Sequence, residues 1–274
     1  MAPRFTLIRL RPPPRHRKGG SRESFHHASL RYIGDVVYGS LDGIITTFAV
    51  VNGVTGANLS PGIVVILGLA NLLADGLSMG VGAFLSLKSG KEYFDQERRR
   101  ESWEVDEYPE EEREELVEIY ETQSYSREDV ETIVAIQAKN RNQLVDAMMI
   151  HELGLYVDER MPLKRASATF VSFVISGSVP LLAYLGGLMF DLSPSLQFML
   201  SVAMTAVALF ALGAAKVMIT ELRWFRSGLE TLVVGGIAAA GAFLVGFGLR
   251  GIGGQPAYLT LFLPQPPRSR DGKV

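Results

Sequence analysis

Long apolar stretches alternate with one long polar segment along this chain of 274 residues. The apolar stretches run from Tyr32 to Val54, Pro61 to Leu87, Ala166 to Phe190, Pro194 to Ile219 and Leu229 to Leu249. Each is long enough to cross the hydrocarbon core of a bilayer as a helix, which takes about 20 residues. The pattern therefore predicts an all-α integral membrane protein with five transmembrane helices.

The composition agrees with this prediction and limits the kinds of metal ligand that the chain can offer. Hydrophobic residues make up 47% of the chain and the mean hydropathy is +0.18, values that a soluble protein with unusually long buried helices explains poorly. The chain contains no Cys, which excludes a disulfide framework and any thiolate metal site. A bound metal would therefore need oxygen, imidazole or thioether ligands.

The polar segment between the second and third apolar stretches, residues 91–165, is much longer than a helical hairpin requires. It carries 21 of the 29 acidic residues of the chain, an asymmetry that the formal net charge of -2 hides. We therefore predict that this segment is a small acidic domain inserted between spans 2 and 3.

Local signals divide this acidic domain into three helices. The second span continues past Leu87 without a helix breaker, Pro109 is well placed to open a helix, and Ser126 with Asp129 resembles a capping box. The predicted helices cover Lys91–Glu104, Glu110–Thr122 and about Ser126–Val157, the last with an interruption near Asn140.

Positive charge marks the expected cytosolic side. Residues 1–31 contain eight Lys and Arg and one acid, Glu23, and the loops after the second and fourth spans are also rich in Lys and Arg. The positive-inside rule then places the N-terminus and the acidic domain in the cytosol. The predicted organisation is a disordered basic tail (1–31), spans 1 and 2 (32–90), the cytosolic domain (91–165), spans 3 to 5 (166–249) and a C-terminal tail (250–274).

Three acids lie within the first two spans, where an Asp at the helix centre costs about 3 kcal/mol on insertion scales. Asp35 and Asp42 are seven residues apart on one helix face, and Asn71, Asp75 and Met79 follow at intervals of four on another. Hydrogen bonding between helices explains an amide such as Asn71, but it does not explain three acids. If the two faces meet without a basic residue between them, they favour a divalent cation.

Carboxylates also recur on single helix faces of the acidic domain. The residues concerned are the pair Glu101 and Glu104, the pair Glu112 and Glu115, and the group Met148, Met149 and Glu152. A solvated acidic face is the simplest explanation of such a charge run, and a Met pair on a helix is more often part of a core. Thioethers beside carboxylates suit transition metals better than magnesium or calcium, so we favour metal binding.

Three stretches resemble the vacuolar iron transporters. They are GDVVYGSLDGIITTFAVVN from Gly34 to Asn52, GLANLLADGLSMGVGAFLS from Gly68 to Ser86, and AMMIHELGL at the end of the acidic insertion. The resemblance extends from about Asp35 to Leu249 and leaves only the two tails unmatched. One departure is Ala83, where some relatives carry an acid, so an additional ligand at that position is in doubt.

The resemblance implies a five-span homodimer in the lipid bilayer that exchanges cytosolic ferrous iron, or another divalent metal such as manganese, for protons. Iron would be the substrate, with no tightly bound cofactor and no nucleic-acid partner. Asp42 and Met79 would line the translocation path. The implied ligands of the cytosolic domain are Glu101, Glu104, Glu112, Glu115, Met148, Met149 and Glu152. The membrane would be vacuolar in a eukaryote and the plasma membrane in a prokaryote.

The side chains allow this exchange, because a carboxylate such as Asp42 binds either a proton or a metal ion. The Met79 thioether does not titrate in the physiological range and can contribute only selectivity. Competition between metal and proton for one carboxylate, combined with alternating access, is the minimum that an antiporter needs.

Other classes of function stay open: a membrane-anchored di-iron carboxylate oxidase, a metal sensor, or a passive scaffold. The oxidase design typically needs Glu-x-x-His on two helices, and none of the four His lies three residues after a Glu. His151 and Glu152 do not form HExxH, and the chain contains no P-loop, no GxSxG and no dinucleotide fingerprint.

Overall fold

The structure is a computed structural model that describes residues 31–123, 125–215 and 223–250. These residues form helices joined by short connections, with no strand among them. The helices are α2 (Ile33–Gly56), α3 (Pro61–Glu107), α4 (Pro109–Thr122), α5 (Arg127–Gln137), α6 (Arg141–His151), α7 (Pro162–Gly177), α8 (Val179–Phe190), α9 (Pro194–Ala215) and α10 (Trp224–Gly248). The predicted terminal tails lie outside the described residues, apart from Arg31 and Arg250.

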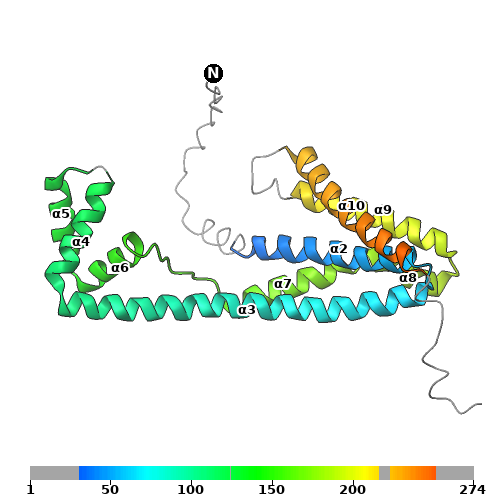
Figure 1. The fold of residues 1–274 in the computed structure, drawn as a ribbon, viewed down its shortest axis with the longest axis horizontal. Coiled ribbons are helices and arrows are strands. Elements are labelled where there is room, and N and C mark those ends of the chain that lie inside the picture. Colours follow the sequence, from blue (N-terminus) through cyan, green and yellow to red (C-terminus); the bar gives the residue numbers. More distant parts are fainter. Residues whose placement is uncertain (1–30, 124, 216–222, 251–274) are drawn as a thin grey trace, which may run out of the picture.

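The helix α3 runs through both parts of the molecule. It is 47 residues long without a break, which corresponds to about 70 Å at 1.5 Å per residue. Helices α4, α5 and α6 gather at its C-terminal end, and α2, α7, α8, α9 and α10 lie along its N-terminal part (Figure 1). The second span therefore projects as one rigid helix into the acidic domain, as the absence of a breaker predicts.

Four helices of the described chain are long and apolar enough to cross a membrane: α2, α3, α9 and α10. The third predicted span, 166–190, is not one straight helix, because α7 and α8 meet at an angle of 47° and count as a fifth span only when taken together. Pro180, which cannot donate a backbone hydrogen bond and crowds the preceding turn, explains the break at Ser178. The fifth predicted span begins earlier than Leu229, at Trp224, and the predicted end of the fourth, Ile219, lies outside the described residues.

The third predicted helix of the acidic domain is two helices. Ser126 caps α5 by accepting a hydrogen bond from the Asp129 backbone N–H, as predicted, and the chain breaks before Asn140, whose side chain accepts from the Asn142 N–H and starts α6. Helix α6 ends at His151 and not near Val157. Gly154, with a φ of +63°, takes the left-handed conformation that commonly follows a helix end.

Two separate cores hold the molecule together. In the acidic domain, side chains such as Val105, Leu116 and Leu144 pack around the buried pair Met148 and Met149. In the membrane part, α2 is central and packs most extensively against α7, α10 and α3. The α2–α7 contact is so close that a Cβ atom at Gly43 would clash with the backbone of Phe173. Small residues of this kind let membrane helices approach at backbone distance.

Candidate metal centre

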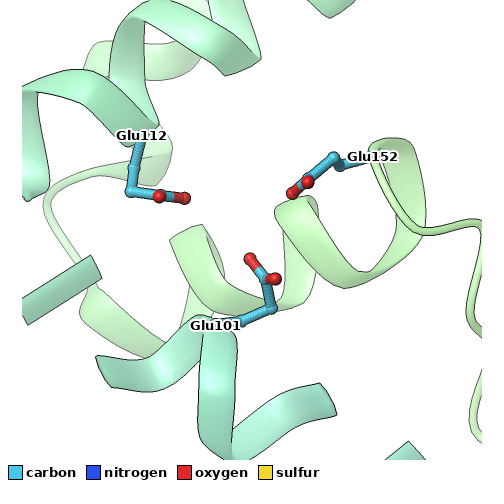
Figure 2. A group of neighbouring side chains, drawn as sticks. All are labelled: Glu101, Glu112 and Glu152. Atoms are coloured by element: carbon cyan, nitrogen blue, oxygen red, sulfur yellow. The ribbon is translucent and has the colours of Figure 1, made fainter. Parts of the chain in front are cut away.

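Three glutamates converge at the C-terminal end of α3. Glu101 comes from α3, Glu112 from the first turn of α4 and Glu152 from the end of α6. Their carboxylates point toward one another, and one oxygen of each lies within 4.8 Å of the others (Figure 2). A carboxylate cluster drawn from three helices at this spacing is able to hold a divalent cation between its oxygens.

Two features of the domain hold together the helices that carry these glutamates. Val105 of α3, Leu116 of α4 and Met148 of α6 belong to one buried hydrophobic core. Helix α6 is fastened to α3 by the Arg98–Asp146 ion pair and by Arg141, which binds Asp106 and donates to the Ser102 carbonyl at 2.8 Å. These arginines were not predicted, because their partners are 35 to 48 residues away and no local spacing reveals such a pair.

Burial and mutual repulsion make the cluster hold protons near neutral pH. Loss of hydration, and then the charges of Glu152, Glu104 and Glu112, raise the pKa of Glu101 to about 8. Loss of hydration and the charges of Glu104, Glu115 and Glu152 raise the pKa of Glu112 to about 7. The pKa of Glu152 is raised for the same reasons, against a small lowering by Arg100. A cation in the centre would relieve this repulsion by displacing protons.

Two carboxylate oxygens of the centre are buried and unpartnered. Within the described part of the chain, neither Glu101 Oε2 nor Glu112 Oε2 has a hydrogen-bond partner. A buried ionised oxygen without a partner is costly, so each needs either a proton or a cation. This distinguishes the centre from a solvated acidic face, the simplest explanation of the sequence, because Glu101 is only 2% exposed.

The other predicted ligands of the domain surround this centre at different depths. Glu104 is half-buried and accepts a hydrogen bond from Arg100 Nε at 3.2 Å, while Glu115 is exposed. Both are close enough for their charges to raise the pKa of Glu112 and Glu152. The five predicted glutamates thus form one electrostatic group, in which three stand at mutual ligand distance.

Met148 and Met149 lie in the hydrophobic core of the domain, with side chains 0% and 1% exposed. This is the more common role of a Met pair on a helix. Their contribution of a thioether ligand stays a prediction. The ring of His151, two residues after Met149, packs edge-on against the ring of Tyr120.

A second acidic site lies between the membrane helices α2 and α3. The half-buried Asp42 of α2 and Asp75 of α3 are close enough for their charges to act on each other. Met79, one turn further along α3, packs against the membrane core around Phe173. Asn71, one turn earlier, has a buried amide nitrogen without a hydrogen-bond partner among the described residues. Of the two polar faces that the sequence singled out, Asp42 and Asp75 therefore lie within range of each other's charge.

Asp35 departs from the expectation that no basic residue neutralises the membrane acids. Its Oδ1 accepts a hydrogen bond from Arg165 Nε at 2.9 Å, and Arg160 Nη1 lies 3.8 Å from its Oδ2. The expectation was wrong here because Asp35 occupies the first turn of α2, where the connection to α7 passes, and not the middle of a span. Asp35 is therefore an ion-paired residue and stands apart from Asp42 and Asp75.

The sequence of this chain matches the family model described as the VIT family over residues 33–247. The chain belongs to the VIT family. A protein named vacuolar iron transporter from Toxoplasma gondii is 37% identical over 234 residues, which cover 83% of this chain and 78% of the relative. The vacuolar iron transporter of Plasmodium falciparum is 34% identical over 233 residues, covering 82% and 85%. Vacuolar iron transporter 1 of Arabidopsis thaliana is 34% identical over 221 residues, covering 80% and 86%.

Membership of the VIT family confirms the resemblance drawn from the sequence motifs. The matched region contains both acidic sites, because it begins at the first residue of α2 and ends near the last residue of α10. This VIT-family chain is thus a helical protein with four or five candidate membrane spans and an acidic domain carried on α3.

Proposed function

We propose that this VIT-family protein moves ferrous iron out of the cytosol and into a vacuole in exchange for protons. The observation that carries the proposal is the glutamate centre with its buried and unpartnered oxygens. One of its members, Glu101, lies on α3, the helix that also carries Asp75 and Met79. The relatives named vacuolar iron transporter support iron as the cargo and the vacuole as the destination.

Each site has a different part in the proposed cycle. The glutamate centre captures iron from the cytosol, and the ion displaces the protons that Glu101 and Glu112 hold near neutral pH. Iron then binds between α2 and α3, where it replaces a proton on Asp42. A proton returning from the far side releases it, which gives an obligatory exchange when access alternates between the two sides.

The proposal includes an orientation, a partner and a second cargo. The acidic domain faces the cytosol, in line with the positive charge of the loops, and two copies of the chain assemble into a homodimer. Manganese is a competing cargo, because carboxylate ligands bind both Mn²⁺ and Fe²⁺. The two ions are neighbours in the general order of affinities.

The test uses the purified protein in liposomes, with ferrous iron added outside and a pH-sensitive dye inside. Asp42→Asn removes the titrating group, whereas Glu118→Gln removes an exposed acid of α4 outside the centre and serves as the control. We expect iron entry with internal alkalinisation in the wild type and in Glu118→Gln, and neither in Asp42→Asn.

Four results would contradict the proposal. Iron flux without a pH change would remove the proton coupling, and full activity of Asp42→Asn would remove Asp42 from the path. Iron binding without any flux would favour a sensor, and oxygen consumption with ferrous iron would favour the oxidase.

A further inference from the structure

A short non-helical segment joins the metal centre to the membrane helices. It consists of residues 153–161, called the strap here, which begins directly after Glu152 and ends where α7 starts at Pro162. Glu152 is one of the three converging glutamates, so the strap is attached directly to the glutamate centre.

The strap is fastened at three points to the first turn of α2 and to the two residues that precede it. Arg31 pairs with Glu159 at 2.8 Å, and the Met161 backbone N–H donates to the Tyr32 hydroxyl at 2.8 Å. The third and most buried point is Asp35, 9% exposed, which pairs with Arg160 of the strap and with Arg165 of α7.

Arg160 is itself held within the strap. Its guanidinium donates to both carboxylate oxygens of Asp158, at 2.7 and 3.1 Å to Oδ2 and 3.0 Å to Oδ1. These bonds hold the pKa of Asp158 at about 2, so the pair stays charged at physiological pH. Arg160 therefore presents a fixed positive charge to Asp35.

We propose that Asp35 is a positioning residue for transport and not a ligand on the ion path. The Asp35–Arg160–Arg165 cluster fixes the strap against α2, two helical turns before Asp42 on the same face, or about 10 Å along the axis. It thereby fixes the position of the segment that carries Glu152 relative to the helix that carries Asp42. The inference rests on the proposed function and assigns a mechanical link between its two sites.

The charges around Asp35 argue against a ligand role. Two guanidinium groups face its carboxylate, with side chains that are 24% and 32% exposed, so an incoming divalent cation would meet positive charge. Asp42, by contrast, lies within range of the charge of another acid, Asp75. The environments of the two aspartates favour opposite partners, a fixed cation for Asp35 and a mobile one for Asp42.

The experiment compares Asp35→Asn with Arg165→Gln in the full-length protein, because an arginine cannot ligate iron. Glu131→Gln, which breaks an exposed pair with Arg127 on α5, away from the strap, is the matched control. Iron binding is measured in detergent, and the maximal rate and apparent KM of iron uptake are measured in liposomes. We expect both test variants to bind iron as the wild type does and to lose at least about fivefold in maximal rate, the lower end of typical coupling factors. The control keeps the wild-type rate.

A double variant completes the test. If the two residues act through one contact, Asp35→Asn with Arg165→Gln is no slower than the slower single variant. A slow Asp35→Asn beside a normal Arg165→Gln would mark Asp35 as a ligand, and loss of iron binding in both would mark a merely structural pair. Wild-type rates in both variants would also overturn the positioning role and leave the proposed function intact. Absence of flux in the wild type would overturn the proposed function and this inference with it.

Discussion

Glu101 shows how burial changes the chemistry of an ordinary acid. The same carboxyl group on a solvated helix face would be ionised at neutral pH and would attract any cation weakly. Next to Glu112 and Glu152, and with only 2% of its surface exposed, its pKa is raised to about 8, so it keeps its proton at neutral pH. The metal binding proposed at this centre would therefore release protons, and its affinity would depend on pH.

The pH dependence of metal binding follows from these raised pKa values. As pH rises from 6 to 8, Glu112 and then Glu101 lose their protons, so the proton competes less and we expect affinity to increase by about tenfold or more. Glu101→Gln should bind at least about tenfold more weakly at pH 8, since losing even an outer partner costs that much, and should show a shallower pH profile.

Calorimetry with Mn²⁺, which avoids oxidation of ferrous iron, measures both effects on the full-length protein in detergent. Glu118→Gln is again the control and should follow the wild-type profile. Affinity that does not change between pH 6 and 8, or that falls, would contradict the proton-release reaction.

The boundaries of some helices in this chain could be predicted from the sequence, and those of others could not. Pro109 and the Ser126–Asp129 capping box act within a few residues, so the starts of α4 and α5 could be predicted from local chemistry. The break at Ser178 was missed, because an apolar run of membrane-spanning length hides the effect of Pro180. The convergence of Glu101, Glu112 and Glu152 was only partly predictable. Spacing identified the faces, but the meeting of three helices depends on tertiary contacts such as Arg141 with Asp106.

The close packing of helix α2 against helix α7 leads to a prediction about stability. A methyl group at Gly43 would clash with the Phe173 backbone, so Gly43→Ala should push the two helices apart and cost about 1–3 kcal/mol, as overpacking typically does. Gly82 of α3 has open space at its Cβ position, and Gly82→Ala should be neutral or stabilising by up to about 1 kcal/mol through helix propensity.

Thermal unfolding in detergent compares the two alanine variants directly. A lower midpoint for Gly43→Ala and an unchanged or higher one for Gly82→Ala is the expected pair of results. Equal midpoints would mean that the α2–α7 contact relaxes without cost.

At the scale of the whole molecule, chemical labelling can test which side of the membrane each part of the chain lies on. With α3 crossing the membrane, the acidic domain at its C-terminal end and the α8–α9 connection lie on opposite sides. The chain has no native Cys, so a single introduced thiol reports one position without a background.

We expect an impermeant thiol reagent added to the cytosolic side of sealed vesicles to label Glu118→Cys on α4 and not Ser195→Cys at the start of α9. Reagent on the other side should give the reverse pattern. Both positions are exposed, so burial does not limit the labelling. Labelling of both positions from one side would contradict the predicted orientation and the five-span arrangement.

The length of α3 has an electrical consequence. Glu101 and Asp75 are 26 residues apart on one unbroken helix, which separates them by about 39 Å along the axis. At physiological ionic strength the Debye length is about 8 Å, so the solvent ions screen a charge bound at Glu101 over several such lengths before its field reaches Asp75. A metal ion bound at the glutamate centre would therefore not change the electrostatic potential at the membrane site. Only the ion itself or a movement of the backbone can then carry information between the two sites.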